Sequence, residues 1–434
     1  MGMRKEDKGV HMAGEIRITE ITDQIKLESP MPLLEVESFG FTWGINEHAL
    51  LTVEGYVNGQ EQVAGLHDGK VRLLAGKDTT LFYGQLTQIR IDNVGRIAKI
   101  HLEAKSGSYK LDQVPGSRSF QDGSETYAKI VQDVAECAEG RVICTVGKDV
   151  EIGKPFIQYG ETPWAFCRRL ASRLGTCIIP DIVTGEPAFW FGMRNGDRVA
   201  GFSEEEYTME MYQGSAEGES GIAYEVESRE FYKLGDRTVF CGMEMTIYGV
   251  RAEFKNGELI YHYLLRESYA VRSIYLDRFC GLGLRGTVVE VRQEQVRVAL
   301  DIDGGNPTGE YFYDWYPETG NALYAMPETG ARIILYFGGR DEREGFVMHC
   351  LPENRESGWD YKNRNLATKE GNTVHLYEGS IDFSNQGKHS LSVGNGTVGI
   401  RSTGKVTVSA KSGVKINASR IFISTPDELD ICQG

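Results

Sequence analysis

The last part of the chain, residues 366–434, repeats a short β-type pattern about every eight residues. Units such as HSLSVGNG, TVGIRSTG and KVTVSAKSG alternate apolar and polar residues and then close on a glycine. A short fixed period indicates an array of strands in place of a globular domain. One unit can hide only one narrow apolar face, so neighbouring units or other copies of the chain must supply the remaining walls. The repeat therefore predicts a β-rod wound from more than one chain.

Within this rod, alternation by two places the apolar residues of each run on one face. The residues predicted to point inward are Val393, Val398, Ile400, Val406, Val408, Val414, Ile416, Ile421 and Ile423. Three glycines are predicted at the corners between faces, where glycine adopts a positive φ without the steric cost of a Cβ atom. They are Gly396, Gly404 and Gly413.

Composition limits the partners of the chain. Glycine accounts for 52 of 434 residues, roughly 12% against a typical ~7%, which favours many tight β-turns. The formal net charge is −15. Binding to duplex nucleic acid requires a basic face that displaces counterions, so nucleic acid is disfavoured as a partner.

The cysteines and the N-terminus indicate a protein made in the cytosol. The eight cysteines include no CxxC pair and mostly lie within apolar runs, which is typical of reduced core residues. Residues 1–14 are charged and lack the apolar core of a signal peptide, and we expect them to be flexible. The sequence contains no stretch of the ~18–20 apolar residues that a membrane span requires.

Residues 15–275 predict an α+β unit with two related β-subdomains and helices between them. A first helix is expected over residues 124–138 with Ser124 as its N-cap. A second is marked more clearly, because Thr162 precedes Pro163 at the first helical position and Gly175 follows the apolar face. A short acidic helix is predicted for residues 203–213.

Residues 281–352 predict a separate β-module. Five apolar-rich runs in about 65 residues fit a small Greek-key barrel such as the OB-fold. The runs are residues 287–292, 295–302, 311–315, 331–337 and 345–350. Residues 353–365 are polar and rich in turn formers, which predicts a linker into the repeat.

Several motifs with catalytic or binding associations favour structural interpretations. Residues 281–286 match GxGxxG, but a β-rich run follows where a nucleotide site needs a helix. Residues 301–306 lack the ligand spacing of a calcium loop and are expected between barrel strands. His349 and Cys350 are adjacent on a strand, so their side chains point to opposite faces. The sequence has no HExxH or GxSxG motif.

Aromatic residues at 311–316 (YFYDWY) could stack on single-stranded nucleic acid, as OB-folds often do. That use needs a basic groove beside the aromatic rings. The nearby charged residues are Glu310, Asp314 and Glu318, which repel phosphate. Packing within the barrel is therefore the favoured interpretation.

Three features in this order resemble the central spike of contractile injection systems, meaning the VgrG proteins and the T4-type hub-spike. The first is the FYKLGD turn at residues 231–236. The second is GLGLRGTVVEVRQEQVRVALDID at 281–303, followed by YFYDWYP at 311–317 and YAMPETG at 324–330. The third is the repeat at the C-terminal end. The resemblance covers the chain from about residue 15 onward.

The resemblance implies a mainly β protein with three parts: an α+β baseplate hub-like domain (15–275), an OB-fold barrel (281–352) and a triple-stranded β-helix needle (366–434) in an intertwined homotrimer. It implies a structural role, and from the missing motifs we expect no catalytic residues, cofactor or metal. The implied partners are tail tube and baseplate proteins, a PAAR-like cap at the needle end and, transiently, the target envelope. The implied localisation is synthesis in the bacterial cytoplasm and assembly into a particle that acts outside the cell or is injected.

Two departures from that family concern the barrel and the repeat. No lysozyme domain stands between the barrel and the repeat, and no His-x-His pair lies near the end, because His375 and His389 are separated by more than one repeat. An alternative function is an OB-fold protein that binds nucleic acid or oligosaccharide and carries a β-solenoid appendage.

Overall fold

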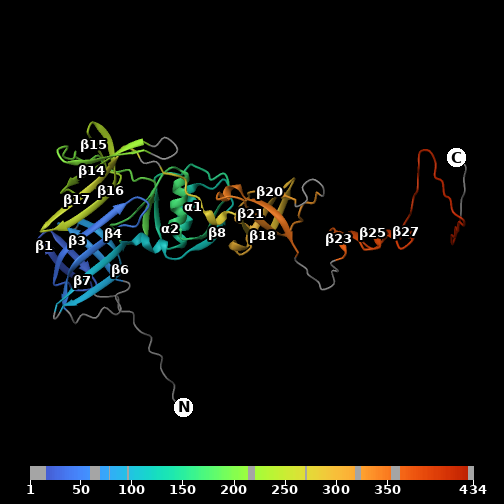
Figure 1. Cartoon of the computed structure of the whole chain (residues 1–434), viewed down its shortest axis with the longest axis horizontal. Coiled ribbons are helices and arrows are strands. Elements are labelled where there is room, and N and C mark those ends of the chain that lie inside the picture. The colour runs from blue at the N-terminus through green and yellow to red at the C-terminus, as the bar shows by residue number, and fades with distance from the viewer. Residues whose placement is uncertain are drawn as a thin grey trace, which may run out of the picture. The chain divides into compact units, whose positions relative to one another are not determined.

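The computed structural model describes residues 16–58, 69–77, 79–94, 97–213, 220–268, 271–317, 324–352 and 362–428. The predicted flexible segment 1–14 and most of the predicted linker lie outside these residues. The chain divides into two compact units at residue 351 (Figure 1). The mainly β fold with a closed barrel confirms the predicted fold class for the first unit.

Twelve strands of the first unit form one sheet, in the order β1-β2-β5-β6-β7-β4-β3-β16-β17-β14-β13, with β15 paired to β16. Their bounds are β1 Arg17–Thr22, β2 Ile25–Ser29, β3 Glu35–Gly44, β4 Leu50–Asn58, β5 Lys70–Ala75, β6 Thr79–Val94, β7 Ile97–Ser106, β13 Tyr207–Gln213, β14 Ser220–Ser228, β15 Arg237–Phe240, β16 Met243–Lys255 and β17 Glu258–Arg266.

The two predicted β-subdomains join in this sheet through β3 and β16, which are about 200 residues apart in sequence. Phe39 and Phe254 pair across the two strands and their rings stack at 4.8 Å. Both side chains lie on the face that carries the main apolar core. Burial of these aromatic rings stabilises the joint between the two halves of the sheet.

A layer with the helices α1 and α2 follows the first half of the sheet in sequence. It contains η1 Gly107–Asp112, β8 Gly116–Phe120, α1 Tyr127–Cys137, β9 Arg141–Cys144, β10 Phe156–Glu161, α2 Pro163–Arg173, β11 Ile178–Pro180 and β12 Ala188–Phe191. These elements share a second apolar core, built on the buried faces of α1 and α2.

The predicted N-cap of α2 is confirmed, and the predicted N-cap of α1 is wrong. Thr162 accepts a hydrogen bond from the backbone of Ala165, Pro163 begins the helix, and Gly175 has a φ of 63° just beyond its end. The first helix begins later than predicted. Its N-cap is Thr126, because Ser124 instead bonds the carboxylate of Asp122 with both its backbone and its hydroxyl group.

The predicted acidic helix at 203–213 is wrong. Residues 207–213 form strand β13, which pairs with β14 over its whole length. Tyr207, Met209 and Met211 alternate by two, a strand period that the neighbouring glutamates obscured in the sequence.

The predicted barrel is confirmed. Five strands close in the order β18-β19-β20-β22-β21. They are β18 Leu282–Arg292, β19 Gln295–Leu300, β20 Tyr313–Tyr316, β21 Arg332–Phe337 and β22 Phe346–Leu351, with short 3₁₀ turns η2 Asp277–Phe279, η3 Asp301–Asp303 and η4 Glu342–Glu344. Inward residues of all five strands fill its core, which also contains Ile157 and Phe279. The barrel therefore shares part of its core with β10 and with the segment that enters it.

The second unit contains an antiparallel five-stranded meander. Its strands are β23 Arg364–Ala367, β24 Asn372–Leu376, β25 Ser380–Asn385, β26 His389–Gly394 and β27 Thr397–Ser402. Residues 403–428 continue without a strand. No helix in the described part of the chain is long and apolar enough to cross a membrane.

Candidate functional site

The meander β23–β27 has one apolar face. Strand register places Val374 opposite Phe383, and Phe383 opposite Leu391, which in turn faces Ile400. The apolar residues of the five strands therefore lie together. They are Leu366, Val374, Leu376, Ile381, Phe383, Leu391, Val393, Val398 and Ile400.

This apolar face is open to solvent in the single chain. Phe383 is 44% exposed, Val398 is 69% exposed and Ile400 is 62% exposed. The opposite face carries polar residues such as Asp382 and Ser392, whose side chains hydrogen-bond each other at 2.5 Å. A contiguous apolar face of this kind marks an interaction surface.

The remaining predicted core residues lie beyond the meander and are also exposed. Exposure ranges from 53% at Val406 to 71% at Val408, and Val414, Ile416, Ile421 and Ile423 lie between these values. Gly396 and Gly413 have φ angles of 74° and 137°. Gly404 lacks a positive φ in the single chain. The prediction missed the apolar residues of β23–β25, although the same alternation marks them in the sequence.

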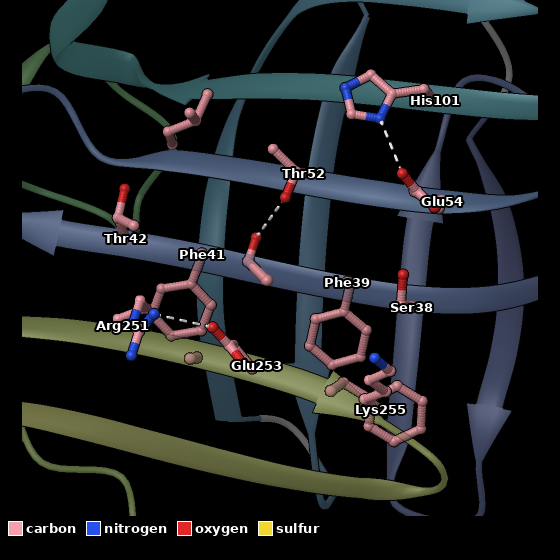
Figure 2. Close-up of a pocket in the computed structure, with 14 residues that line it drawn as sticks. Ser38, Phe39, Phe41, Thr42, Thr52, Glu54, His101, Arg251, Glu253 and Lys255 are labelled. Carbon is pink, nitrogen blue, oxygen red and sulfur yellow. Dashed lines mark hydrogen bonds and ion pairs between the residues drawn. The ribbon is translucent and has the colours of Figure 1, made fainter.

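A groove of about 370 Å³ with mixed apolar and polar lining crosses β3, β4, β7 and β16 of the sheet (Figure 2). Gly40 leaves room in its floor, where a Cβ atom would lie 2.9 Å from Ala252 O. His101 Nδ1 lies 3.8 Å from Glu54, and Arg251 Nη1 lies 3.2 Å from Glu253. Because these charged groups pair with one another, their arrangement does not indicate an ion-binding site.

A hydrogen-bonded row of three side chains resembles the catalytic triad of a hydrolase. It consists of Ser108, His48 and Asp112. Ser108 Oγ lies 2.9 Å from His48 Nδ1, and Asp112 Oδ2 lies 3.3 Å from His48 Nε2. A catalytic serine must be reached by substrate, but Ser108 is fully buried and also bonds Ser106 Oγ at 2.8 Å. The arrangement supports a structural tie between the sheet and the helical layer.

Asp112 extends this tie to α2 by accepting a hydrogen bond from Thr162, the N-cap residue. Burial alone would raise the pKa of the Asp112 carboxyl. The hydrogen bonds from His48 and Thr162 outweigh burial and hold that pKa below its usual value.

The other motifs have structural positions. Residues 282–286 of the GxGxxG match lie within β18 itself, where a nucleotide site would need a turn that opens a helix. Asp303 accepts hydrogen bonds from Ser119 N at 2.8 Å and Ser119 Oγ at 2.6 Å, and burial raises its pKa despite them. Of the aromatic residues, Tyr313 and Trp315 lie in the barrel core, whereas Tyr316 is 53% exposed.

His349 and Cys350 lie at an irregularity of β22. His349 has a φ of 54°, and the register of β21 and β22 shifts beside it. Strict alternation of the two side chains therefore does not hold there. Among the described residues, no group of three or more His, Cys, Asp or Glu side chains is arranged to hold a metal ion.

Comparison of the whole structure with solved structures finds related folds. One is the E. coli c3393 protein, a component of the type VI secretion system described as similar to the T4 bacteriophage tail proteins gp27 and gp5. It has 13% identity and a TM-score of 0.54, over 77% of this chain and 99% of that one. This chain has the VgrG/T4-type hub-spike fold.

Two structures of a PdpA–VgrG complex share the hub-spike fold. The half-lidded Francisella complex has 7% identity and a TM-score of 0.55, over 84% of this chain and 83% of the other. The lidless complex has 8% identity and a TM-score of 0.54, over 84% and 93% of the two chains. No protein-family model and no curated protein matches the sequence.

Proposed function

We propose that this chain is a structural hub and spike of a contractile injection system, such as a phage tail, a tailocin, or a type VI or extracellular system. The observation that carries the proposal is the exposed apolar face of β23–β27, which follows a hub and a barrel in one chain. The solved structures with this fold are named as secretion-system and VgrG proteins, which supports the same role.

Three copies of the chain would cover that face in the proposed homotrimer. Each sheet hides its apolar side against the other two, and residues 403–428 obtain strand partners from neighbouring copies. A closed rod of this kind leaves no unpaired backbone edge. Such a rod resists bending and fraying, as a part that is driven through an envelope must.

The proposed partners follow from this arrangement. The hub, residues 15–275, meets tail tube and baseplate proteins, and a PAAR-like cap covers the needle end. The target envelope is a transient partner, and nucleic acid is not one. The protein is made in the bacterial cytoplasm, is assembled into the particle and acts outside the producing cell. Its role is mechanical and does not involve catalysis.

Light scattering of the full chain and of a variant truncated before Leu366 tests the proposal. We expect a trimer for the full chain and a loss of trimer stability after truncation. A monomeric full chain whose C-terminal repeat is rapidly cleaved by protease would exclude the needle. Equal trimer stability before and after truncation would show that other surfaces hold the copies together.

A further inference from the structure

Arg169, in the middle of α2, is a fully buried arginine that reaches from the helical layer into the barrel. Its Nε and Nη2 atoms donate to the two carboxylate oxygens of Glu161 at 3.0 and 2.8 Å. Nη2 also donates to Ile157 O at 2.8 Å. Nη1 donates to Glu342, which lies in η4 of the barrel. One guanidinium group thus connects β10, α2 and the barrel.

Glu342 makes the connection hard to open. Its side chain is fully buried, although it comes from a short turn between two barrel strands. The neighbouring Asp341 accepts a hydrogen bond from Arg173 at 3.0 Å. Removing one partner of a buried ion pair leaves an uncompensated charge, so separation of barrel and helical layer is disfavoured by a factor of ~10² or more.

A second contact joins the two parts through backbone groups. Tyr311 N donates to Gln121 O at 3.0 Å. Gly309 lies so close to this strand end that an added Cβ atom would be 2.1 Å from Asp122 N. The barrel is therefore attached through η4 on one side and through residues 303–311 on the other.

The segment that enters the barrel also packs on α2. Ile274 N donates to Ser172 Oγ at 2.8 Å, and the guanidinium group of Arg173 lies 3.9 Å from the centre of the Tyr275 ring. These contacts limit the freedom of the connection, but its residues are largely exposed. The buried charges lie at η4, so opening at that contact carries the largest electrostatic cost.

We propose that Arg169 is a positioning residue that locks the barrel onto the helical layer, so that hub and barrel move as one rigid body within each chain. In the proposed spike, mechanical force transmitted from the hub to the needle then passes through the Glu161–Arg169–Glu342 ion pairs as well as through the covalent backbone that links hub and barrel. The lock is complete within one chain and does not depend on the proposed trimer.

Hydrogen–deuterium exchange of the full-length Arg169→Met variant tests the lock. Peptides that contain Gln121 and Tyr311 report opening of the contact, and peptides from β3 and β16 report the intact sheet. We expect exchange in the first pair to rise at least about tenfold while the second pair is unchanged, since local opening raises exchange locally. Arg251→Met, which removes a half-exposed arginine of the sheet, is the matched control and should leave both pairs unchanged.

Two further variants keep the test decisive if Arg169→Met does not fold. Glu342→Gln keeps the volume of the side chain and removes one buried charge, and it should raise the same exchange. Gly309→Ala forces the second contact apart and should also raise exchange at Gln121 and Tyr311. Gly339→Ala is its control and should leave this exchange unchanged, because a Cβ atom there meets nothing within 4 Å.

Adding Glu161→Gln and Glu342→Gln to Arg169→Met should restore part of the protection, because no unpaired charge then remains. A merely space-filling role of Arg169 would give no such recovery. Unchanged exchange at Gln121 and Tyr311 in both Arg169→Met and Glu342→Gln would overturn the lock. Light scattering of the same samples separates this result from a failure of the proposed trimer.

Discussion

Ile400 provides a direct test of the needle. It lies on β27 opposite Leu391, within the apolar face of the meander. Ile400→Ser removes an aliphatic side chain that is mostly exposed in one chain but that the proposed needle would enclose in three copies at once. The substitution should therefore weaken association and leave the fold of each chain largely intact.

The size of the effect follows from exposure. Ile400 is 62% exposed in the single chain, so its enclosure adds about 1–2 kcal/mol, taking ~1.5–3 kcal/mol for full burial of such a side chain. Three copies contribute about 3–6 kcal/mol to one trimer. At about 1.4 kcal/mol per tenfold change, the trimer should weaken by a factor of ~10²–10⁴.

Arg401→Ser is the matched control because the next residue of the strand points to the opposite face. Arg401 is exposed and pairs with Ser390 on the polar side. Sedimentation velocity over a range of concentrations should show dissociation of Ile400→Ser under conditions where Arg401→Ser remains associated. Equal dissociation of both variants, or of neither, would refute an inward position for Ile400.

Three other predictions concern the first unit. Thr162→Ala should destabilise the helical layer by about 1–2 kcal/mol in urea unfolding, and Thr162→Ser should not, because the hydroxyl group caps α2. Burial raises the pKa of Cys177 to about 12 and that of Cys167 beyond the ordinary thiol range. After treatment with an alkylating reagent at pH 8, mass spectrometry should find both cysteines unmodified until the protein unfolds. The exposed Cys137 should be alkylated in the folded protein. The pKa of Asp112 is lower in the folded protein than in the unfolded chain, where it is about 4. The ionised carboxylate therefore stabilises the fold above about pH 4, and this stability is lost as the pH falls through the folded pKa. Urea unfolding should show a larger loss of stability for Asp112→Asn at pH 7 than at pH 3.

Local signals predicted the elements whose determinants lie close together in sequence. The start of α2 needs only Thr162 and Pro163, and the barrel strands follow from short apolar runs between turns. The sequence of β13 is ambiguous, because its glutamates fit an acidic helix while Tyr207, Met209 and Met211 alternate as in a strand. Both results depend on a window of about ten residues, within which one period must be preferred over another.

The joint of the sheet and the lock of the barrel depend on residues far apart in sequence. Phe39 and Phe254 meet although more than 200 residues separate them, and Arg169 and Glu342 are 173 residues apart. Arg169 also follows Phe166 and Cys167 on α2, where a charged residue normally indicates the solvent side of a helix. Nothing within the helix shows that a barrel carboxylate will compensate this charge.

The end of β27 separates two parts of the repeat that differ in pairing but not in pattern. Val398 and Ile400 alternate on a paired strand, and Val406 and Val408 continue the same alternation beyond residue 402 without one. Strand propensity is therefore equal on both sides of that point. What changes is strand pairing, since each strand of the meander pairs with a neighbour in the same chain, whereas residues 403–428 form no strand. In the proposed homotrimer, this segment would obtain its strand partners from the other two copies, and that requirement favours an intertwined needle over a solenoid formed by one copy.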